Sequence, residues 1–257
     1  MIINKKTGAA LLVLIASVLI FSTSLLAQSS KKNAVKTDGI AIDMGLSVKW
    51  ASCDLGENGF VRSPKEDAAL FAWGEAEAKS DFKGEWRNYK WATYKGNWVM
   101  TKYSDRQHRL EKEDDAAANK LGGGWRMPTH LEFKELIDNC DITEKKLKGV
   151  RGLLFTSKIN GNSIFFPGEY YKDDVYTKRY WCDDLDRSYQ QDAYSFYFKI
   201  SPKSSSRLYY DIMSVERYKG FAIRPVLGDD DFFEDFCQNM TDNVLSGFRL
   251  TPDGVYP

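Results

Sequence analysis

Short runs of β-branched and aromatic residues, separated by turn residues, fill the chain from Gly152 onward and constrain its fold more than any other feature. Such runs are typical of strands. The helix signals lie earlier in the chain, and helices first with strands later favour an α+β domain over a parallel α/β sheet. Along Ala193–Ile200, alternation places Tyr194, Phe196 and Phe198 on one face. The other expected strands are Leu46–Ala51, Leu153–Ser157, Ser163–Phe166, Arg179–Cys182, Arg207–Met213 and Gly220–Val226.

The clearest helix signal begins at Thr129, which forms a capping box with Glu132. An apolar stripe at positions i, i+3, i+4 and i+7 follows, and it predicts a helix with one face toward a core. The residues of this stripe are Phe133, Leu136, Ile137 and Cys140.

Two further helices are expected. Ser63, Pro64 and Glu66 combine an N-cap, a proline at the first helical position and a capping glutamate. The segment from Glu111 to Leu121 has acidic residues in its first turn and a glycine directly after it.

The segment Gly122–Thr129 (GGGWRMPT) predicts the turn that leads into the Thr129 helix. Its glycines permit positive φ, and Pro128 prevents a helix from continuing. Trp125 and Met127 are expected to fill the core. A phosphate-binding loop is disfavoured, because no Lys-Ser or Lys-Thr pair follows the glycines.

The N-terminal thirty residues predict export. Two lysines precede an apolar run, Ala9–Phe21, and small residues follow it, as in a secretory signal peptide. The expected organisation is a signal peptide at 1–27, a flexible leader at 28–42, one domain at 43–227 and an acidic, aromatic appendage at 228–257. After signal removal no membrane span is expected, and the location is secreted, cell-surface or periplasmic. An uncleaved membrane anchor is the rival interpretation.

Composition narrows the classes of partner. Thirty-six basic residues balance thirty-six acidic ones, so the chain lacks the positive charge that nucleic-acid binding requires. Aromatic residues make up 14% of the chain, which suits irregular cores and also surfaces that bind sugars or proteins. Only two histidines, His108 and His130, occur, and no C-x-x-C motif, so a zinc site is not expected.

Arginines and cysteines of the expected core need partners. Arg126 and Arg224 are expected to pair with carboxylates, because a lone buried arginine is costly. The four cysteines of an exported chain are compatible with disulfides, and four allow three pairings. The expected acidic partners are residues such as Glu75, Asp114 or Asp115.

Seven segments, taken in order, resemble one known family. They are Val48–Gly56 (VKWASCDLG), Leu70–Glu75 (LFAWGE), Glu113–Ala117 (EDDAA), Gly123–Thr129 (GGWRMPT), Asn160–Pro167 (NGNSIFFP), Tyr180–Trp181 and Gly220–Val226 (GFAIRPV). Together they are similar to the Fibrobacter-type major paralogous domain, common in exported proteins of Bacteroides-like bacteria. The resemblance covers roughly Asp43 to Leu227.

This resemblance implies a C-type-lectin-like fold with two main helices, a mixed and mostly antiparallel set of short strands, and long loops. It also implies a non-catalytic binding role at the cell surface, with a glycan or a protein as partner. Cys53 and Cys140 both lie in the part of the chain that the resemblance covers, at positions expected near the core, and the resemblance therefore implies a disulfide between them. Cys182 and Cys237 form the remaining pair.

The segment Gly168–Gln191 mixes tyrosines and a tryptophan with charged residues, a composition suited to sugar stacking or to a protein hot spot. Calcium-dependent sugar binding is possible for such a fold but lacks support, because the strings Glu-Pro-Asn, Gln-Pro-Asp and Trp-Asn-Asp do not occur. No cofactor or metal is therefore expected. The predicted binding residues are Tyr170, Tyr171, Tyr176, Trp181, Asp183 and Asp184.

No catalytic residue is expected. Arg126–Thr129 and Gly220–Phe221 are similar to segments of formylglycine-generating oxidases, but neither Cys182 nor Cys237 lies in the context that their reactive cysteine pair requires. The main alternative to ligand binding is a structural role in a cell-surface or fimbrial assembly, with the appendage docking into a neighbour.

Overall fold

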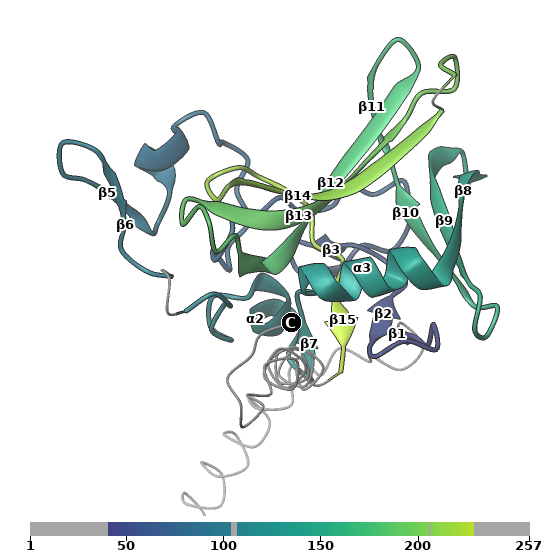
Figure 1. Cartoon of the computed structure of the whole chain (residues 1–257), viewed down its shortest axis with the longest axis horizontal. Helices are drawn as coiled ribbons and strands as arrows, with labels where there is room; N and C mark the ends of the chain where they lie inside the picture. The colour runs from purple at the N-terminus through teal and green to yellow at the C-terminus, as the bar shows by residue number, and fades with distance from the viewer. Residues whose placement is uncertain (1–40, 104–106, 206, 229–257) are drawn as a thin grey trace, which may run out of the picture. The chain divides into compact units, whose positions relative to one another are not determined.

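The computed structural model describes residues 41–103, 107–205 and 207–228 (Figure 1). Every pair of hydrogen-bonded strands in this part is antiparallel, and helices are few. The architecture is thus α+β with mostly antiparallel strands, as predicted. No helix within these ranges has the length and apolarity needed to cross a membrane. The predicted signal peptide and all of the predicted appendage except Gly228 lie outside the described residues.

A four-stranded sheet joins the two ends of the domain. Its strand order is β1-β2-β15-β7. Val226 of β15 pairs with Trp50 of β2 on one side and with Arg126 of β7 on the other. The first strand begins two residues before the predicted domain start, inside the predicted leader. The bounds are β1 Ala41–Ile42, β2 Lys49–Ala51, β7 Trp125–Arg126 and β15 Val226–Leu227.

Two sheets of longer strands and two hairpins contain the other strands of the described residues. One sheet has the order β10-β9-β8 and the other β11-β12-β13-β14, so β14 is an edge strand. The bounds are β8 Cys140–Leu147, β9 Val150–Ser157, β10 Ser163–Pro167, β11 Glu169–Lys172, β12 Val175–Leu185, β13 Asp192–Ile200 and β14 Leu208–Glu216. The hairpins are β3 Leu55–Gly56 with β4 Gly59–Phe60, and β5 Ala92–Tyr94 with β6 Trp98–Met100.

Helix α3, His130–Asn139, begins as the sequence predicts. The Thr129 hydroxyl accepts from the Glu132 amide at 3.0 Å, and the Glu132 carboxylate accepts from the Thr129 amide at 2.8 Å. Figure 1 shows α3 crossing the face of the β11–β14 sheet, and Phe133 stacks on Phe196 of β13 at 4.9 Å between ring centroids. The helix thereby closes one core, which also contains Cys140.

A second core lies around Trp73, Met127 and Trp181, all at most 2% exposed. Helix α2, Ala116–Leu121, contributes Ala116 and Ala117 to it. This helix is shorter than the predicted Glu111–Leu121, because Asp115 is its N-cap: the Asp115 carboxylate accepts from the amides of Ala117 and Ala118. Gly122 ends it at a φ of 60°, as expected.

The helix predicted after Ser63 is wrong. The local hydrogen bonds of a helix start are present, since the Glu66 amide donates to the Ser63 carbonyl at 3.0 Å and the Glu66 carboxylate accepts from the Arg62 amide at 2.7 Å. These bonds form a single turn. The turn does not continue as a helix, because the Ala69 amide donates to the Leu55 carbonyl and the Phe71 amide to the Phe221 carbonyl.

The expected partners of two buried arginines also need correction. Arg126 pairs with Glu132, at 2.9 Å between Nη1 and Oε2, and Arg224 pairs with Asp54, at 2.8 Å between Nε and Oδ1. Neither uses Glu75, Asp114 or Asp115. Asp115 is instead occupied as the α2 cap and as acceptor for the Met127 amide, and Asp114 pairs with Lys90 and Lys102.

The predicted Cys53–Cys140 disulfide is not formed. Cys53, Cys140 and Cys182 are all free thiols in this structure. Cys140 lies inside the α3 core, whereas Cys53 is half-buried in the segment between β2 and β3 and is no member of that core. Cys182 is fully buried in β12, and Cys237, its predicted partner, lies outside the described residues.

Candidate functional site

The residues predicted to bind a ligand fall into two groups. Tyr170 and Tyr171 of β11 are 65% and 64% exposed. Tyr176 of β12 is half-buried, and its ring lies 5.7 Å from that of Tyr170. Asp173 and Asp174 form the two-residue turn of this hairpin, both with positive φ, as in a type I′ turn. The tyrosines therefore lie on an exposed hairpin.

Trp181, Asp183 and Asp184 do not join these tyrosines at a surface. Trp181 is fully buried, and its indole nitrogen donates to the Phe71 carbonyl at 2.8 Å. Asp183 and Asp184 are each 3% exposed. The structure thus excludes these three side chains from direct contact with a ligand at the tyrosine hairpin.

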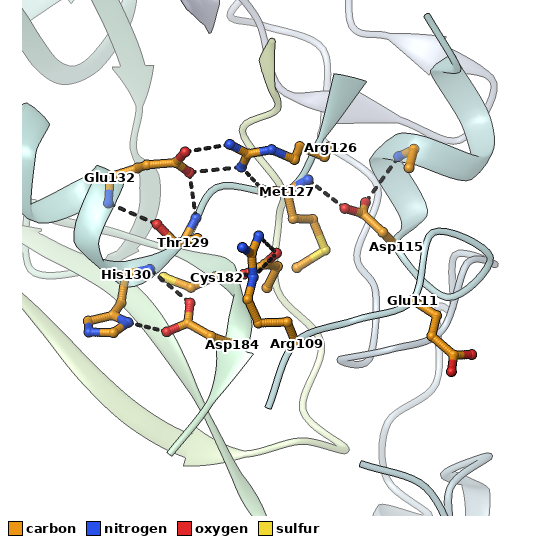
Figure 2. A network of polar contacts seen from close by, with 12 residues as sticks. Arg109, Glu111, Asp115, Arg126, Met127, Thr129, His130, Glu132, Cys182 and Asp184 are labelled. Carbon is orange, nitrogen blue, oxygen red and sulfur yellow. Dashed lines mark hydrogen bonds and ion pairs between the residues drawn. The ribbon is translucent and has the colours of Figure 1, made fainter. Parts of the chain in front are cut away.

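Asp183 and Asp184 belong instead to a polar network with Arg109 and His130. Figure 2 labels Asp184, Arg109 and His130 of this network. Arg109 Nε donates to Asp183 at 3.0 Å, and the His130 ring pairs with Asp184. Burial raises the pKa of Asp183, the Arg109 guanidinium lowers it, and the neighbouring Asp184 carboxylate raises it. The Asp184 carboxylate also accepts from the His130 amide at 2.9 Å, so the network ties β12 to the start of α3.

Cys182 lies in the same network, and together with His130 and Asp184 it has the composition of a nucleophilic triad (Figure 2). The thiol does not have the required electrostatics. Burial raises the pKa of Cys182 well above its ordinary value, and Asp184, Asp183 and Glu132 raise it further. Reactive cysteines need the thiolate, which positive neighbours stabilise. The Cys182 environment favours the neutral, structural form.

An exposed aromatic groove lies elsewhere, on the β5–β6 hairpin. Tyr94 and Trp98 pair across the hairpin, with their ring centroids 5.4 Å apart. Together with Trp86 and the charged side chains of Lys83, Glu85 and Arg87 they line a cleft of about 770 Å³.

Trp98 also lines a second cleft, of about 660 Å³. The segment Ser188–Asp192, which contains Tyr189, Gln190 and Gln191, lines this cleft together with Glu216 from the end of β14. Tyr189 is 65% exposed. We call the two clefts together the Trp98 groove.

Local contacts hold both walls of the Trp98 groove in place. The Trp86 ring lies 4.7 Å from Tyr218 and 5.7 Å from Tyr89, which orients it edge-on to both. The turn that carries Tyr189 is closed by hydrogen bonds from the Ser188 amide to the Asp186 carboxylate and from the Asp192 amide to the Tyr189 carbonyl, both 2.8 Å. The Trp86 ring and the backbone of the turn that carries Tyr189 are therefore held by the fold itself.

The Trp98 groove has the chemistry of a site for neutral polar ligands. Indole and phenol rings offer flat faces for the C–H groups of a sugar, and amides and carboxylates offer hydrogen bonds to hydroxyls. Burial raises the pKa of Asp192, and the carboxylates of Glu216 and Asp186 raise it further. No group of three or more His, Cys, Asp or Glu side chains suited to a metal ion occurs in the described ranges.

Most residues of the Trp98 groove were not predicted from the sequence. Tyr189, Gln190 and Gln191 lie in the segment predicted to bind, but Trp98 was not predicted. A local signal for it exists: aromatic residues flank the Lys95-Gly96-Asn97 turn, which is typical of a hairpin that presents two rings.

Comparison with known proteins finds no match: no protein family, no curated protein and no solved structure is significantly similar to this chain.

Proposed function

We propose that this protein is a non-catalytic binding protein of the cell exterior, and that its Trp98 groove recognises a glycan without calcium. The observation that carries the proposal is the exposure of Tyr94 and Tyr189, both 65% exposed, along two clefts that share the half-buried Trp98. Exposed tyrosine rings gathered at clefts that half-buried tryptophans line are typical of a surface with a binding partner.

The proposal includes a finer description of the fold, namely a C-type-lectin-like domain of the Fibrobacter-type major paralogous kind. Three features support it. The domain ends meet in one sheet, the Gly122–Thr129 segment places Trp125 and Met127 in the core, and long irregular segments separate β4 from α2. An exported location, secreted, cell-surface or periplasmic, rests on the N-terminal sequence.

A glycan array with the chain from Gln28 tests the function, run once with calcium and once with chelator. We expect binding in both conditions. The Tyr189→Ala variant should bind at least tenfold more weakly, because it loses a stacking face. Tyr170→Ala is the matched control, since Tyr170 and Tyr189 are equally exposed, at 65%.

The control also separates the Trp98 groove from the predicted tyrosine hairpin. Loss of binding in Tyr170→Ala with retention in Tyr189→Ala would move the site to β11 and overturn the groove assignment. Binding that disappears with chelator would contradict a calcium-independent site, and no binding to any glycan would contradict the function.

A structural role in a surface assembly is the second candidate, and one observation favours it. Strand β14 is a nine-residue edge strand, with Tyr209 and Tyr210 46% and 37% exposed. An edge strand can pair with a strand from another chain. Analytical ultracentrifugation tests this: concentration-dependent oligomers that persist after truncation at Gly228 support β14, and a monomer at all concentrations contradicts assembly.

A further inference from the structure

A small pocket lies on the face of the β11–β14 sheet opposite α3. It has a volume of about 280 Å³ and is lined by residues that include Glu169, Lys178, Arg179, Tyr197 and Phe221. It shares no lining residue with the Trp98 groove. A space of this size accommodates one small ring or one amino-acid side chain.

Arg179 supplies the positive charge of this pocket. Its guanidinium lies over two aromatic rings, 4.7 Å from the centroid of Tyr197 and 5.3 Å from that of Phe221. Nη1 donates to the Ser195 hydroxyl at 3.0 Å, and Nη2 faces the Met213 sulfur at 3.2 Å. Because the Ser195 hydroxyl itself donates to the Met213 carbonyl at 2.9 Å, the guanidinium is held in one orientation.

No carboxylate pairs with Arg179 among residues 41–103, 107–205 and 207–228. Several other arginines of the described residues pair with acids, although the buried Arg217 also donates only to backbone carbonyls. The one carboxylate lining the pocket, Glu169, is already paired with Lys178. The arginines that do pair with an acid include Arg109 with Asp183, Arg126 with Glu132 and Arg224 with Asp54.

Burial without a carboxylate partner disfavours the charged form of the Arg179 guanidinium. Burial lowers the pKa of Arg179, and the nearby Tyr197 and Tyr209 only partly offset that effect. A guanidinium has five N–H donors, and two of those on Arg179 have protein acceptors. Nε has no protein acceptor among the described residues and is not among the buried polar atoms without a partner, so this donor remains accessible to a ligand.

We propose that the Arg179 pocket binds a carboxylate carried by a small ligand. The planar guanidinium offers a fork that matches a carboxylate, and such charge-assisted pairs are stronger than neutral hydrogen bonds. The Tyr197 and Phe221 rings would pack against the carbon skeleton next to the carboxylate. Two sources of this chemistry fit the pocket volume, an acidic sugar and an acidic amino-acid side chain.

Titration followed by NMR chemical shifts tests the proposal with three probes: methyl glucuronide, methyl glucoside and N-acetylaspartate amide. We expect saturable shifts with methyl glucuronide or N-acetylaspartate amide, and none at the same concentrations with methyl glucoside, which has the ring without the carboxylate. Response to the glucuronide alone identifies an acidic sugar as the source, and response to both acids identifies the carboxylate itself as sufficient.

Two variants and a control locate the site. Arg179→Gln should weaken binding tenfold or more, because it removes the charge and the fork. Arg207→Gln, a change at a surface arginine, should leave it unchanged; the Arg207 side chain is 63% exposed. Thr177→Glu keeps Arg179 but adds a competing carboxylate at the pocket wall, so it should also block binding.

Thr177→Glu keeps the test decisive if Arg179→Gln does not fold. Three results would overturn the proposal: no response to either acid, an equal response to the glucoside, or acid binding that survives Arg179→Gln or Thr177→Glu. Because the Arg179 pocket and the Trp98 groove share no lining residue, the same titrations in Tyr189→Ala separate the two sites: this variant should lose sugar binding at the groove and keep the response of the Arg179 pocket to the acids.

Discussion

Arg224 and Asp54, 0% and 2% exposed, form an ion pair inside the domain. The guanidinium also donates to the carbonyls of Ala51 and Phe165, at 3.1 and 3.0 Å. The Tyr180 hydroxyl donates to the second Asp54 oxygen at 3.1 Å. Both charges are therefore compensated where water does not reach them. Removing one partner of such a pair is costly, because the other charge stays buried alone.

Asp54→Asn should reduce the free energy of unfolding by about 3–5 kcal/mol, since it keeps the shape but leaves Arg224 without a counter-charge. Urea unfolding followed by tryptophan fluorescence measures this. Asp138→Asn is the control at an exposed pair with Lys134, where the expected loss is about 0.5 kcal/mol or less. Equal losses in the two variants would contradict the role of the buried pair.

Among the elements, the segment between β6 and α2 is held by charges that respond to pH. Lys102 Nζ lies 2.6 Å from an Asp114 oxygen and pairs with Glu111, and the Tyr103 hydroxyl donates to Asp114 at 2.7 Å. Burial raises the pKa of Asp114, but hydrogen bonds from Lys102, Tyr103 and Lys90 outweigh it and lower the pKa overall. The hydrogen bond from Lys102 lowers the pKa of Glu111.

A carboxylate whose pKa is lowered by folding stabilises the folded state above its ordinary pKa, and this contribution disappears as the pH falls through the folded value. The ordinary values are 3.8 for Asp114 and 4.5 for Glu111. We therefore expect amide hydrogen exchange in residues 90–103, corrected for the intrinsic pH dependence, to lose protection below about pH 4. Lys102→Met should remove most of this pH dependence, and an unchanged profile in that variant would contradict the assignment.

Local elements of this fold could be predicted from the sequence because their signals are short-range. The Thr129 capping box, the buried stripe through Phe133 and the positive φ of Gly122 depend on residues within one or two turns. The strand Ala193–Ile200 was predicted for the same reason, and Phe196 and Phe198 do share a core.

The Trp98 groove and the arginine partners could not be predicted in this way. Arg224 and Asp54 are 170 residues apart, and no local sequence pattern indicates that Arg224 pairs with Asp54. Trp181 was assigned to a surface because aromatic and acidic residues together suit a binding site. In the structure a register shift between Trp181 and Leu185 places the whole run Tyr180–Leu185 in the interior, where alternation fails as a guide.

For the whole molecule, the sheet β1-β2-β15-β7 decides whether the domain closes. Strand β15 is only two residues long, yet it lies between β2, near the start of the described domain, and β7, near its middle. Without it, β2 and β7 expose backbone groups that need partners.

A chain truncated after Pro225 should therefore fail to fold cooperatively, whereas one truncated after Gly228 keeps β15 and should fold. Thermal unfolding by circular dichroism compares the two. The three-residue difference isolates β15, and a cooperative transition at the same temperature in both chains would show that the sheet does not need it.

Strands β1 and β15 both pair with β2, at Ala51 and at Lys49 respectively. With a spacing of about 4.8 Å between strands and about 3.4 Å per residue along them, the backbone enters and leaves the domain at points about 12 Å apart. Chain ends this close together allow a domain to be inserted into a loop of another protein, or to be joined to further domains, through linkers of a few residues.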